Sequence, residues 1–472
     1  MDNEPNTAVR EPRRWHILIA ILFGSVMGPL DSSIVYTSLP TLADYFSVSL
    51  EKISWISMAY LIVMGGFLLP CGKLGDLIGF RKSYLVGLLV FVIASLFCSL
   101  SSSLNELVIA RVLQAIGAAM SLAMAPAIIT ATFAPGERGK ALGIQGMLVA
   151  VGLAVGPGLG GFLIDYLGWP SIFWINMPLG IVTFIFAYLV LPKSGRSEDK
   201  SFDWAGSVLG FLSLALLIVL TSQAYTWVGS PSVLFLSFLG IALTIAFIRW
   251  EMVVPDPILD LGLFRNRVFS WGILAVLFNF IAQYVAVFLT PFLLQSYLHY
   301  SAAAAGTIMT AFPFTVLFTA PIAGSLSDRY GSQRFAALGC FICAGGIIFL
   351  SMSAMTKNLN LIVGGLIILG LGTGAFQSPN TSAVLSSVKT ARLGAASGVM
   401  ATSRTIGMVL GISIASNLFS HQYAVLQNQF VDNAFAIALM KSYQAGGLMA
   451  CLAGIFILMQ RRNSQQAAKL QQ

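Results

Sequence analysis

Three ionisable residues, Asp31, Arg111 and Arg404, lie well inside long apolar stretches of the chain. A charged side chain is costly in an apolar layer, so one found there is expected to be paired or to take part in function. Asp31 is the only carboxylate in such a position. A carboxyl group that moves between an apolar environment and an arginine can bind and release a proton. Asp31 is therefore the candidate proton carrier, and a fixed structural ion pair is the alternative.

The positions of Asp31 and Arg111 predict that they pair. Asp31 lies about seven residues before the end of its apolar stretch, on the order of 10 Å, and Arg111 lies about six residues after the start of its own, roughly 9 Å. If the two stretches are helices crossing a membrane in opposite directions, the charges lie at matched depth. Each is then the least costly partner for the other. We expect Arg111 to keep the proton affinity of Asp31 in a usable range.

Arg404 has no acidic residue in the apolar stretches around it. Three interpretations stay open: it bonds to backbone carbonyls, it binds an anionic group of a substrate, or it pairs across a two-fold repeat. The three histidines, His16, His299 and His421, are scattered, and the five cysteines all lie in or at the ends of apolar stretches. We therefore expect no metal site, no disulfide framework, no cofactor and no enzymatic activity.

The composition requires a membrane around these charges. Hydrophobic residues make up 57% of the chain and charged residues 9%, whereas soluble domains carry roughly a quarter charged residues. A span needs ~20 mostly apolar residues. This criterion predicts an all-α membrane protein with 14 transmembrane helices, near residues 15–38, 53–71, 83–101, 105–131, 141–167, 170–191, 204–222, 230–250, 269–294, 302–323, 335–354, 359–386, 393–419 and 437–460.

The basic residues predict the orientation. Of the 26, 21 fall in the segments on one side of the predicted membrane, and three, Lys52, Lys357 and Lys441, fall on the other. The positive-inside rule then predicts a multi-pass cell-membrane protein with both termini in the cytoplasm. The basic residues form no continuous stripe, so nucleic acid is excluded as a partner.

Two loops on the cytoplasmic side share one pattern. Residues 72–82 read G-K-L-G-D-L-I-G-F-R-K and residues 324–334 read G-S-L-S-D-R-Y-G-S-Q-R, 252 residues later. The repeat predicts an N-terminal six-helix half at residues 1–191, a linker and inserted helix pair at 192–250, and a C-terminal six-helix half with a tail at 251–472. Glycines permit the tight turn, and the aspartates suit the start of the following helix. We interpret the loops as gating hairpins between two facing states, and a plain topology signal is the alternative; the residues concerned are Gly72, Asp76, Gly79, Arg81, Gly324, Asp328, Arg329 and Gly331.

The fifth predicted span carries Gly152, Gly156, Pro157, Gly160 and Gly161. Small residues at positions i and i+4 let two membrane helices approach closely, and the proline removes one backbone hydrogen bond and bends the helix. A close-packed, bent helix between two halves can rock while it limits leak. Simple packing of small residues is the alternative.

These motifs resemble the major facilitator superfamily, specifically its 14-helix drug:proton antiporter branch, over nearly the whole chain. Residues 30–40, L-D-S-S-I-V-Y-T-S-L-P, are similar to the branch's L-D-x-[TS]-I-V-x-x-[AS]-L-P, and 72–82 resemble the superfamily's signature hairpin. Residues 111–117, R-V-L-Q-A-I-G, resemble R-x-x-Q-G-x-G. Residues 152–161 are similar to the antiporter motif G-x3-G-P-x2-G-G, and 168–180 resemble W-R-W-I-F-x-I-N-x-P-x-G.

The chain departs from the family pattern at a few positions. Leu77 and Phe80 replace basic residues in the first hairpin, and Ala115 replaces a glycine. Tyr36 and Pro170 stand where the branch often has Asn and Arg. These departures leave the fold intact and leave the substrate open.

The resemblance implies alternating access with a substrate cavity between the halves. On the helices that line the cavity in the family, it points to Met27, Tyr36, Gln145, Asn279, Phe280, Gln283, Tyr284, Phe376, Gln377, Asn380 and Arg404. The expected function is proton-coupled export of amphipathic or lipophilic small molecules, with the proton gradient as energy source. A lipid or glycolipid exporter is the alternative, and a proton-coupled importer or a non-transporting sensor is less favoured. The expected partners are a small lipophilic substrate, protons and the bilayer; the sequence does not indicate whether a periplasmic adaptor is needed.

Overall fold

The structure, a computed structural model, describes residues 11–134, 137–192, 203–222, 231–254, 257, 259–389, 392–429 and 433–470. Within these ranges, the side chains of residues 11–13, 69, 76, 221–222, 231–233, 328 and 461–470 are not described. Every regular element in the described part of the chain is helical.

The helices of the first half follow one another with short turns. They are α1 (Glu11–Phe46), α2 (Leu50–Ile78), α3 (Phe80–Leu100), α4 (Leu104–Thr132), α5 (Arg138–Leu167), the short α6 (Ser171–Trp174) and α7 (Asn176–Val190). Serine side chains start two of them: Ser49 accepts a hydrogen bond from the Lys52 amide, and Ser103 from the Glu106 amide. Each serine satisfies one of the donors that a helix start leaves unpaired.

The second half has the same number of spans. An inserted pair, α8 (Trp204–Ser222) and α9 (Pro231–Val253), comes first and is followed by η1 (Leu261–Arg265). The half itself consists of α10 (Arg267–Phe292) with η2 (Leu293–Tyr297), α11 (Ala302–Met309), α12 (Ala311–Tyr330), α13 (Ser332–Thr356), α14 (Leu359–Ser386), α15 (Leu393–Asn428) and α16 (Ala434–Leu470).

The predicted number of spans is confirmed. In the described residues, 13 helical segments are long and apolar enough to cross a membrane, and a shorter apolar helix at Trp204–Leu220 completes the series. Three predicted spans are broken into consecutive pieces: α6 with α7, α10 with η2, and α11 with α12. The domain boundaries at residues 191 and 250 stay a prediction, and part of the predicted linker lies outside the described residues.

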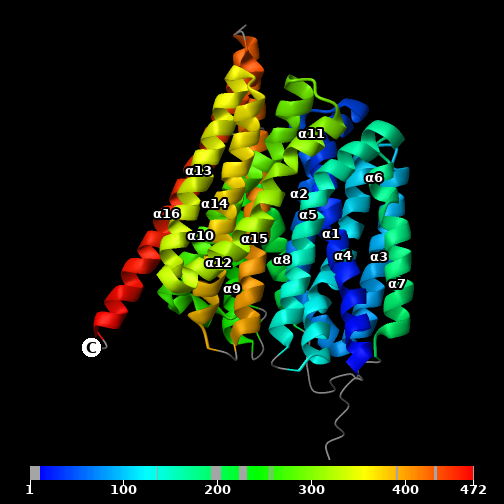
Figure 1. The fold of residues 1–472 in the computed structure, drawn as a ribbon, viewed down its shortest axis with the longest axis vertical. Helices are drawn as coiled ribbons and strands as arrows, with labels where there is room; N and C mark the ends of the chain where they lie inside the picture. The colour runs from blue at the N-terminus through cyan, green and yellow to red at the C-terminus, as the bar shows by residue number, and fades with distance from the viewer. Residues whose placement is uncertain are drawn as a thin grey trace, which may run out of the picture.

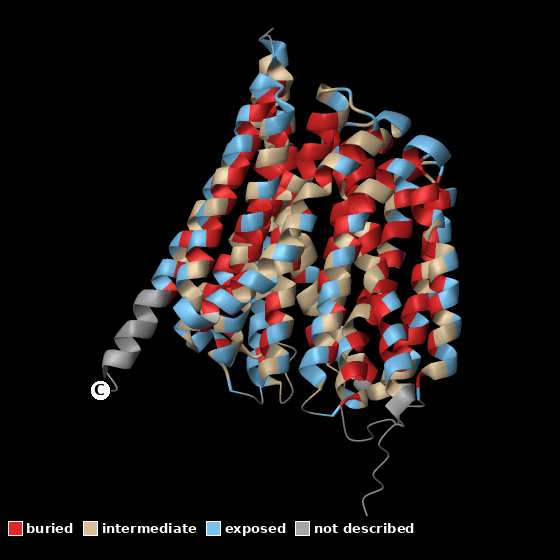
Figure 2. Ribbon diagram, in the orientation of Figure 1, coloured by how far each residue is buried: buried red, intermediate tan, exposed pale blue. Residues whose placement is uncertain are grey.

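The halves lie side by side, with α1 to α7 on one side and α10 to α16 on the other (Figure 1). We call the end where α1 begins and α16 ends the proximal end, and the opposite end the distal end. Helix α8 packs on α2 of the first half and on α15 of the second. Helix α9 packs mainly on α8. Only 11% of the residues in its most apolar stretch are buried, compared with 72% in α10. Exposed positions follow the outer faces of the bundle and buried ones its interior (Figure 2).

The repeat in the two loops has a structural counterpart. Gly79 ends α2 with φ of 92°, and Gly331 ends α12 with φ of 97°. Both also precede the next helix directly, and both backbone amides donate to the residue four positions earlier, Gly75 and Ser327. Positive φ is costly for residues with a Cβ. The glycine at the same place in each loop is therefore required by the turn itself.

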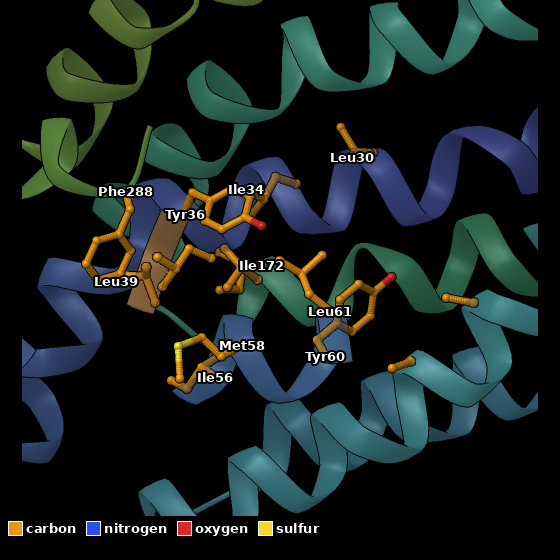
Figure 3. Packing of buried hydrophobic residues seen from close by; sticks show 14 of the residues in the cluster. Leu30, Ile34, Tyr36, Leu39, Ile56, Met58, Tyr60, Leu61, Ile172 and Phe288 are labelled. Carbon is orange, nitrogen blue, oxygen red and sulfur yellow. The ribbon is translucent and has the colours of Figure 1, made fainter. Parts of the chain in front are cut away.

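One apolar cluster joins the halves. It contains Leu39 and Tyr36 of α1 together with Phe288 of α10. Figure 3 shows the Phe288 ring beside Leu39. Membrane helices gain little from leaving lipid, so close packing of this kind is what holds them together.

Candidate functional site

Asp31 lies at the centre of the first half and is fully buried. The Arg111 Nη1 atom of α4 lies 2.5 Å from Asp31 Oδ2, and the Arg111 side chain is 1% exposed. The pairing predicted from matched depth is therefore present. Two charges so placed are each other's necessary partners, because either one alone would be an uncompensated charge in the membrane interior.

Two amide side chains complete the surroundings of the carboxylate. Gln114 Nε2 donates to Asp31 Oδ1 at 3.0 Å, and Asn176 Nδ2 of α7 donates to the same oxygen at 2.7 Å. Gln114 and Asn176 belong to two of the motifs listed above, but sequence reasoning assigned them no role. Their presence in separate motifs was the available signal. The four residues Asp31, Arg111, Gln114 and Asn176 are called the carboxylate hub below.

A second ring of contacts holds the hub. The Arg111 Nε atom donates to the Ile56 carbonyl at 3.4 Å, and its guanidinium lies 4.0 Å from the ring centre of Tyr60. Gln114 is held on its other side, because its Nε2 atom donates to Ser95 Oγ at 2.8 Å. Every helix of the first half except α5 thus contributes to the hub or to the groups that hold it. A change of charge on Asp31 would act on all of these contacts at once.

Helix α5 packs against the part of α1 that carries Asp31. A Cβ added at Gly156 would lie 1.7 Å from Ser33 Oγ, and one at Gly160 would lie 3.0 Å from Ile34 Cα. Gly152 approaches Val26 and Leu30 of the same helix. The glycines therefore bring α5 against the turns of α1 that flank Asp31, the close approach that small residues permit.

The other side of α5 contacts the second half at the distal end. A Cβ at Gly161 would lie 2.1 Å from the Ala302 carbonyl oxygen, and a Cβ at Gly306 would lie 2.0 Å from the Pro157 carbonyl oxygen. Asp165 adds a polar link, because its carboxylate accepts from the Ala302 and Ala303 amides at 3.2 and 2.8 Å. An acidic side chain at a helix N-terminus satisfies free amides and complements the helix dipole. We call this contact the distal clamp. Sequence reasoning assigned no role to Asp165.

Helix α15 repeats the α5 arrangement in the second half. A Cβ at Gly407 would lie 2.6 Å from the Leu277 carbonyl oxygen of α10, and one at Gly411 would lie 2.6 Å from the Ile281 carbonyl oxygen. Gly407 and Gly411 follow Gly152 and Gly156 by 255 residues. The spacing was not recognised in the sequence, because α15 has no Gly-Pro-x-x-Gly-Gly run after it.

The gating hairpins are described in part. Arg81 Nη2 donates to the Tyr188 carbonyl at 2.7 Å, so the first hairpin is tied to the end of α7. Gly72 has open space around it, Gly324 lies against Ser378, and Arg329 is exposed. The side chains of Asp76 and Asp328 lie outside the described residues. The gating role of the hairpins stays a prediction.

The predicted cavity residues fall into three groups. Within the first half, the tip of Met27 lies near Gly180, and Gln145 Nε2 donates to Ser25 Oγ at 3.1 Å. At the seam between halves, the rings of Tyr36 and Tyr284 are 5.6 Å apart. Phe280 lies next to Tyr284, with ring centroids 6.5 Å apart, and the Arg404 guanidinium lies 5.8 Å from the Phe280 ring centre. Gln377 on α14 is partly exposed.

The remaining predicted cavity residues pack inside the second half. Gln283 Nε2 donates to Asn279 Oδ1 at 2.7 Å, and Asn380 Nδ2 donates to the Gly272 carbonyl at 3.3 Å. Phe376 is 1% exposed in the apolar core of this half. A separate hollow of about 480 Å³ lies near the α12–α13 turn and contains none of the predicted cavity residues. Within the described ranges, no three His, Cys, Asp or Glu side chains gather as metal ligands would.

Comparison with known proteins agrees with this architecture. The family described as Major Facilitator Superfamily matches residues 21–412. The riboflavin transporter RibZ of Clostridioides difficile (strain 630) is 34% identical over 450 residues, which cover 94% of this chain and 97% of RibZ. The multidrug transporter protein MdtP of Bacillus subtilis (strain 168) is 30% identical over 408 residues, which cover 86% of this chain and 75% of MdtP.

A solved structure shares the fold. A bacterial homolog of the human lysosomal transporter Spinster, in an inward-facing and occupied conformation, matches with a TM-score of 0.69 and 16% identity, covering 96% of this chain and 97% of that one. The helix order, the family match and the relatives agree. The chain belongs to the major facilitator superfamily of transporters, and its multidrug-transporter relatives agree with the resemblance to the drug:proton antiporter branch.

Proposed function

We propose that the protein exports amphipathic or lipophilic small molecules in exchange for protons, by alternating access. The observation that carries the proposal is the carboxylate hub, in which one buried carboxylate gathers contacts from α4 and α7. Protonation of Asp31 would remove the negative charge to which Arg111, Gln114 and Asn176 all donate. The loss of this charge can rearrange the helices only if they pack closely against one another. The glycines of α5 provide this close packing against α1.

The contacts between halves support an arrangement that is closed at the distal end. The distal clamp joins α5 to α11, and Gln295 Nε2 donates to the Thr37 carbonyl at 2.7 Å in the same region. The positive-inside rule predicts that the proximal end faces the cytoplasm. In this proposal the substrate enters from the proximal side. When the carrier is open at the distal end, a proton binds Asp31, and the carrier then returns to the state that is open at the proximal end.

The proposal is tested in proteoliposomes with an imposed pH gradient, using N-phenyl-1-naphthylamine and riboflavin as probes. Asp31→Asn should abolish gradient-driven accumulation and preserve probe binding, because the amide keeps the shape but cannot cycle a charge. Asp44→Asn, an exposed carboxylate on the same helix, is the matched control and should transport at the wild-type rate. Accumulation by the Asp31→Asn protein on a pH difference alone would reduce the hub to a structural ion pair.

A second candidate, transport of riboflavin or a related flavin, rests on RibZ, whose match extends over almost its full length. A flavin is planar and amphipathic, so it also falls in the class proposed above. Saturable riboflavin flux that excess N-phenyl-1-naphthylamine does not inhibit would favour a dedicated flavin carrier. Export of a lipid or glycolipid instead predicts that neither probe moves while a fluorescent lipid crosses between leaflets.

A further inference from the structure

Arg404 lies in the second half without the partners that an arginine inside a membrane bundle normally has. Its Nη2 atom donates to Thr381 Oγ1 of α14 at 3.2 Å, and its guanidinium lies 5.8 Å from the ring centre of Phe280 on α10. Its Nε atom is buried and makes no hydrogen bond. A guanidinium has five N–H donors, so most of its hydrogen-bonding capacity is unused in this arrangement.

No carboxylate in the described part of the chain forms an ion pair with Arg404. The residues after 250 include only five acidic ones: Glu251, Asp256, Asp260, Asp328 and Asp432. None of the five lies in α10, α14 or α15, the helices that carry Arg404 and its neighbours. An arginine at membrane depth is retained only where it is paired or faces a polar route. Among the described side chains, the counter-charge of Arg404 is therefore missing.

The place of Arg404 is open to a ligand. Arg404, Thr381, Gln377 and Tyr284 are each partly exposed, whereas the residues of the carboxylate hub are fully buried. The neighbouring Thr405 packs against Gly65 of α2, so α15 meets the first half at this level. Arg404 is thus one residue away from the contact between the halves, where alternating access would expose it to one side and then the other.

We propose that Arg404, with Thr381, binds an anionic oxygen group of the substrate, a carboxylate, sulfonate or phosphate attached to an aromatic body. The guanidinium supplies the charge and the unused donors, and the Thr381 hydroxyl supplies a further donor. The rings of Phe280 and Tyr284, stacked with centroids 6.5 Å apart, lie beside it and suit an aromatic body. The inference rests on the proposed function in naming the substrate class of the same carrier.

The test uses two probes with one skeleton: 1-anilinonaphthalene-8-sulfonate, which carries an anionic group, and N-phenyl-1-naphthylamine, which lacks it. Binding to the full chain in nanodiscs is measured by equilibrium dialysis, with empty nanodiscs subtracted. Arg404→Gln should weaken sulfonate binding roughly tenfold or more, as loss of a charge-assisted contact implies, and leave the uncharged probe unchanged. Arg404→Lys keeps the charge but not the planar fork and should fall between.

Arg392→Gln is the matched control, because it removes one arginine charge at an exposed pair with Asp260. Unchanged sulfonate affinity in Arg404→Gln, or an equal loss for both probes, would overturn the assignment. Asp31→Asn separates the two proposals. Normal sulfonate binding by Asp31→Asn, together with no pH-driven flux of either probe by the wild type, would overturn the exchange function and leave the anion site standing. pH-driven flux by the wild type, together with sulfonate binding that Arg404→Gln does not weaken, would overturn the anion site alone.

Discussion

The two halves each contain one arginine deep in the bundle, and their surroundings are opposites. Arg111 contacts Asp31, Gln114, the Ile56 carbonyl and the Tyr60 ring. Within the described residues, Arg404 has one hydrogen bond, to Thr381, and one aromatic neighbour, Phe280. The backbone around them is nevertheless alike, since paired glycines join α5 to α1 and α15 to α10. Duplication has kept the mechanical frame and let the polar chemistry diverge.

This contrast suggests a division of labour. A charge whose partners are all internal can respond to a proton, because neutralising the carboxylate changes the energy of the whole group. A charge with unused donors can respond to a ligand. Energy coupling would then belong to the first half and recognition of an acidic substrate to the second. The α5 glycines and the distal clamp connect the two.

The largest expected difference concerns stability. Arg111→Met leaves Asp31 buried without its counter-charge and should destabilise the protein by about 3–5 kcal/mol. Arg404→Met strands no partner and should leave the thermal unfolding midpoint unchanged or raise it. Midpoints are compared in one detergent at one scan rate. The double variant Asp31→Leu/Arg111→Met should recover much of the loss, because no unpaired charge remains; equal losses for Arg111→Met and Arg404→Met would erase the contrast.

The glycine seams should be equally sensitive in both halves. Gly156→Ala places a Cβ 1.7 Å from Ser33 Oγ, and Gly411→Ala places one 2.6 Å from the Ile281 carbonyl oxygen. Forced overpacking costs about 1–3 kcal/mol, so both should lower the unfolding midpoint and slow transport. Gly146→Ala, on α5 with open space around it, serves as control and should not. Tolerance of Gly411→Ala alone would show that only the first half depends on close approach.

The distal clamp should give the smallest effect. Asp165→Ala removes the acceptor for the first α11 amides, a loss of about 0.5–2 kcal/mol for a helix cap. Because the contact exists only when the distal ends meet, roughly 2- to 30-fold more protein should open there. Spin labels at Ser47 and His299, exposed positions in the two halves, should report a larger population at long distance. A distribution identical to that of wild type would mean that the glycine contacts alone hold this end closed.

Sequence reasoning was most successful for features that depend only on the position of a residue along its helix. Depth along a span follows from counting residues, so the Asp31–Arg111 pair could be predicted. Hydropathy likewise predicted the spans. Rotation about a helix axis is the coordinate that counting does not supply. For this reason Gln114 and Asn176 were not assigned to Asp31, and Asn279 and Phe376 were assigned to a cavity although they pack within the second half.

The helix ends were also extended relative to the predicted spans. Helix α1 continues to Phe46 through Pro40, eight residues beyond the predicted end at residue 38. A proline removes one hydrogen bond, but contacts with neighbouring helices can hold the helix together past that point. Hydropathy measures only the apolar length, and polar turns at the ends of a helix lie outside that measure. Asp165, whose partners belong to the other half, could be found only with both halves in place.

The inserted pair α8 and α9 has a consequence for how such a chain can grow. Each added span reverses the direction of everything that follows it. One extra helix between the halves would turn the second half upside down and move its hairpin to the opposite face. Two helices restore the direction, so Gly79 and Gly331 close their turns at the same end of the bundle. Even parity thus makes this insertion compatible with the duplicated architecture, and α9, mostly outside the packed interior, shows that the addition required little room.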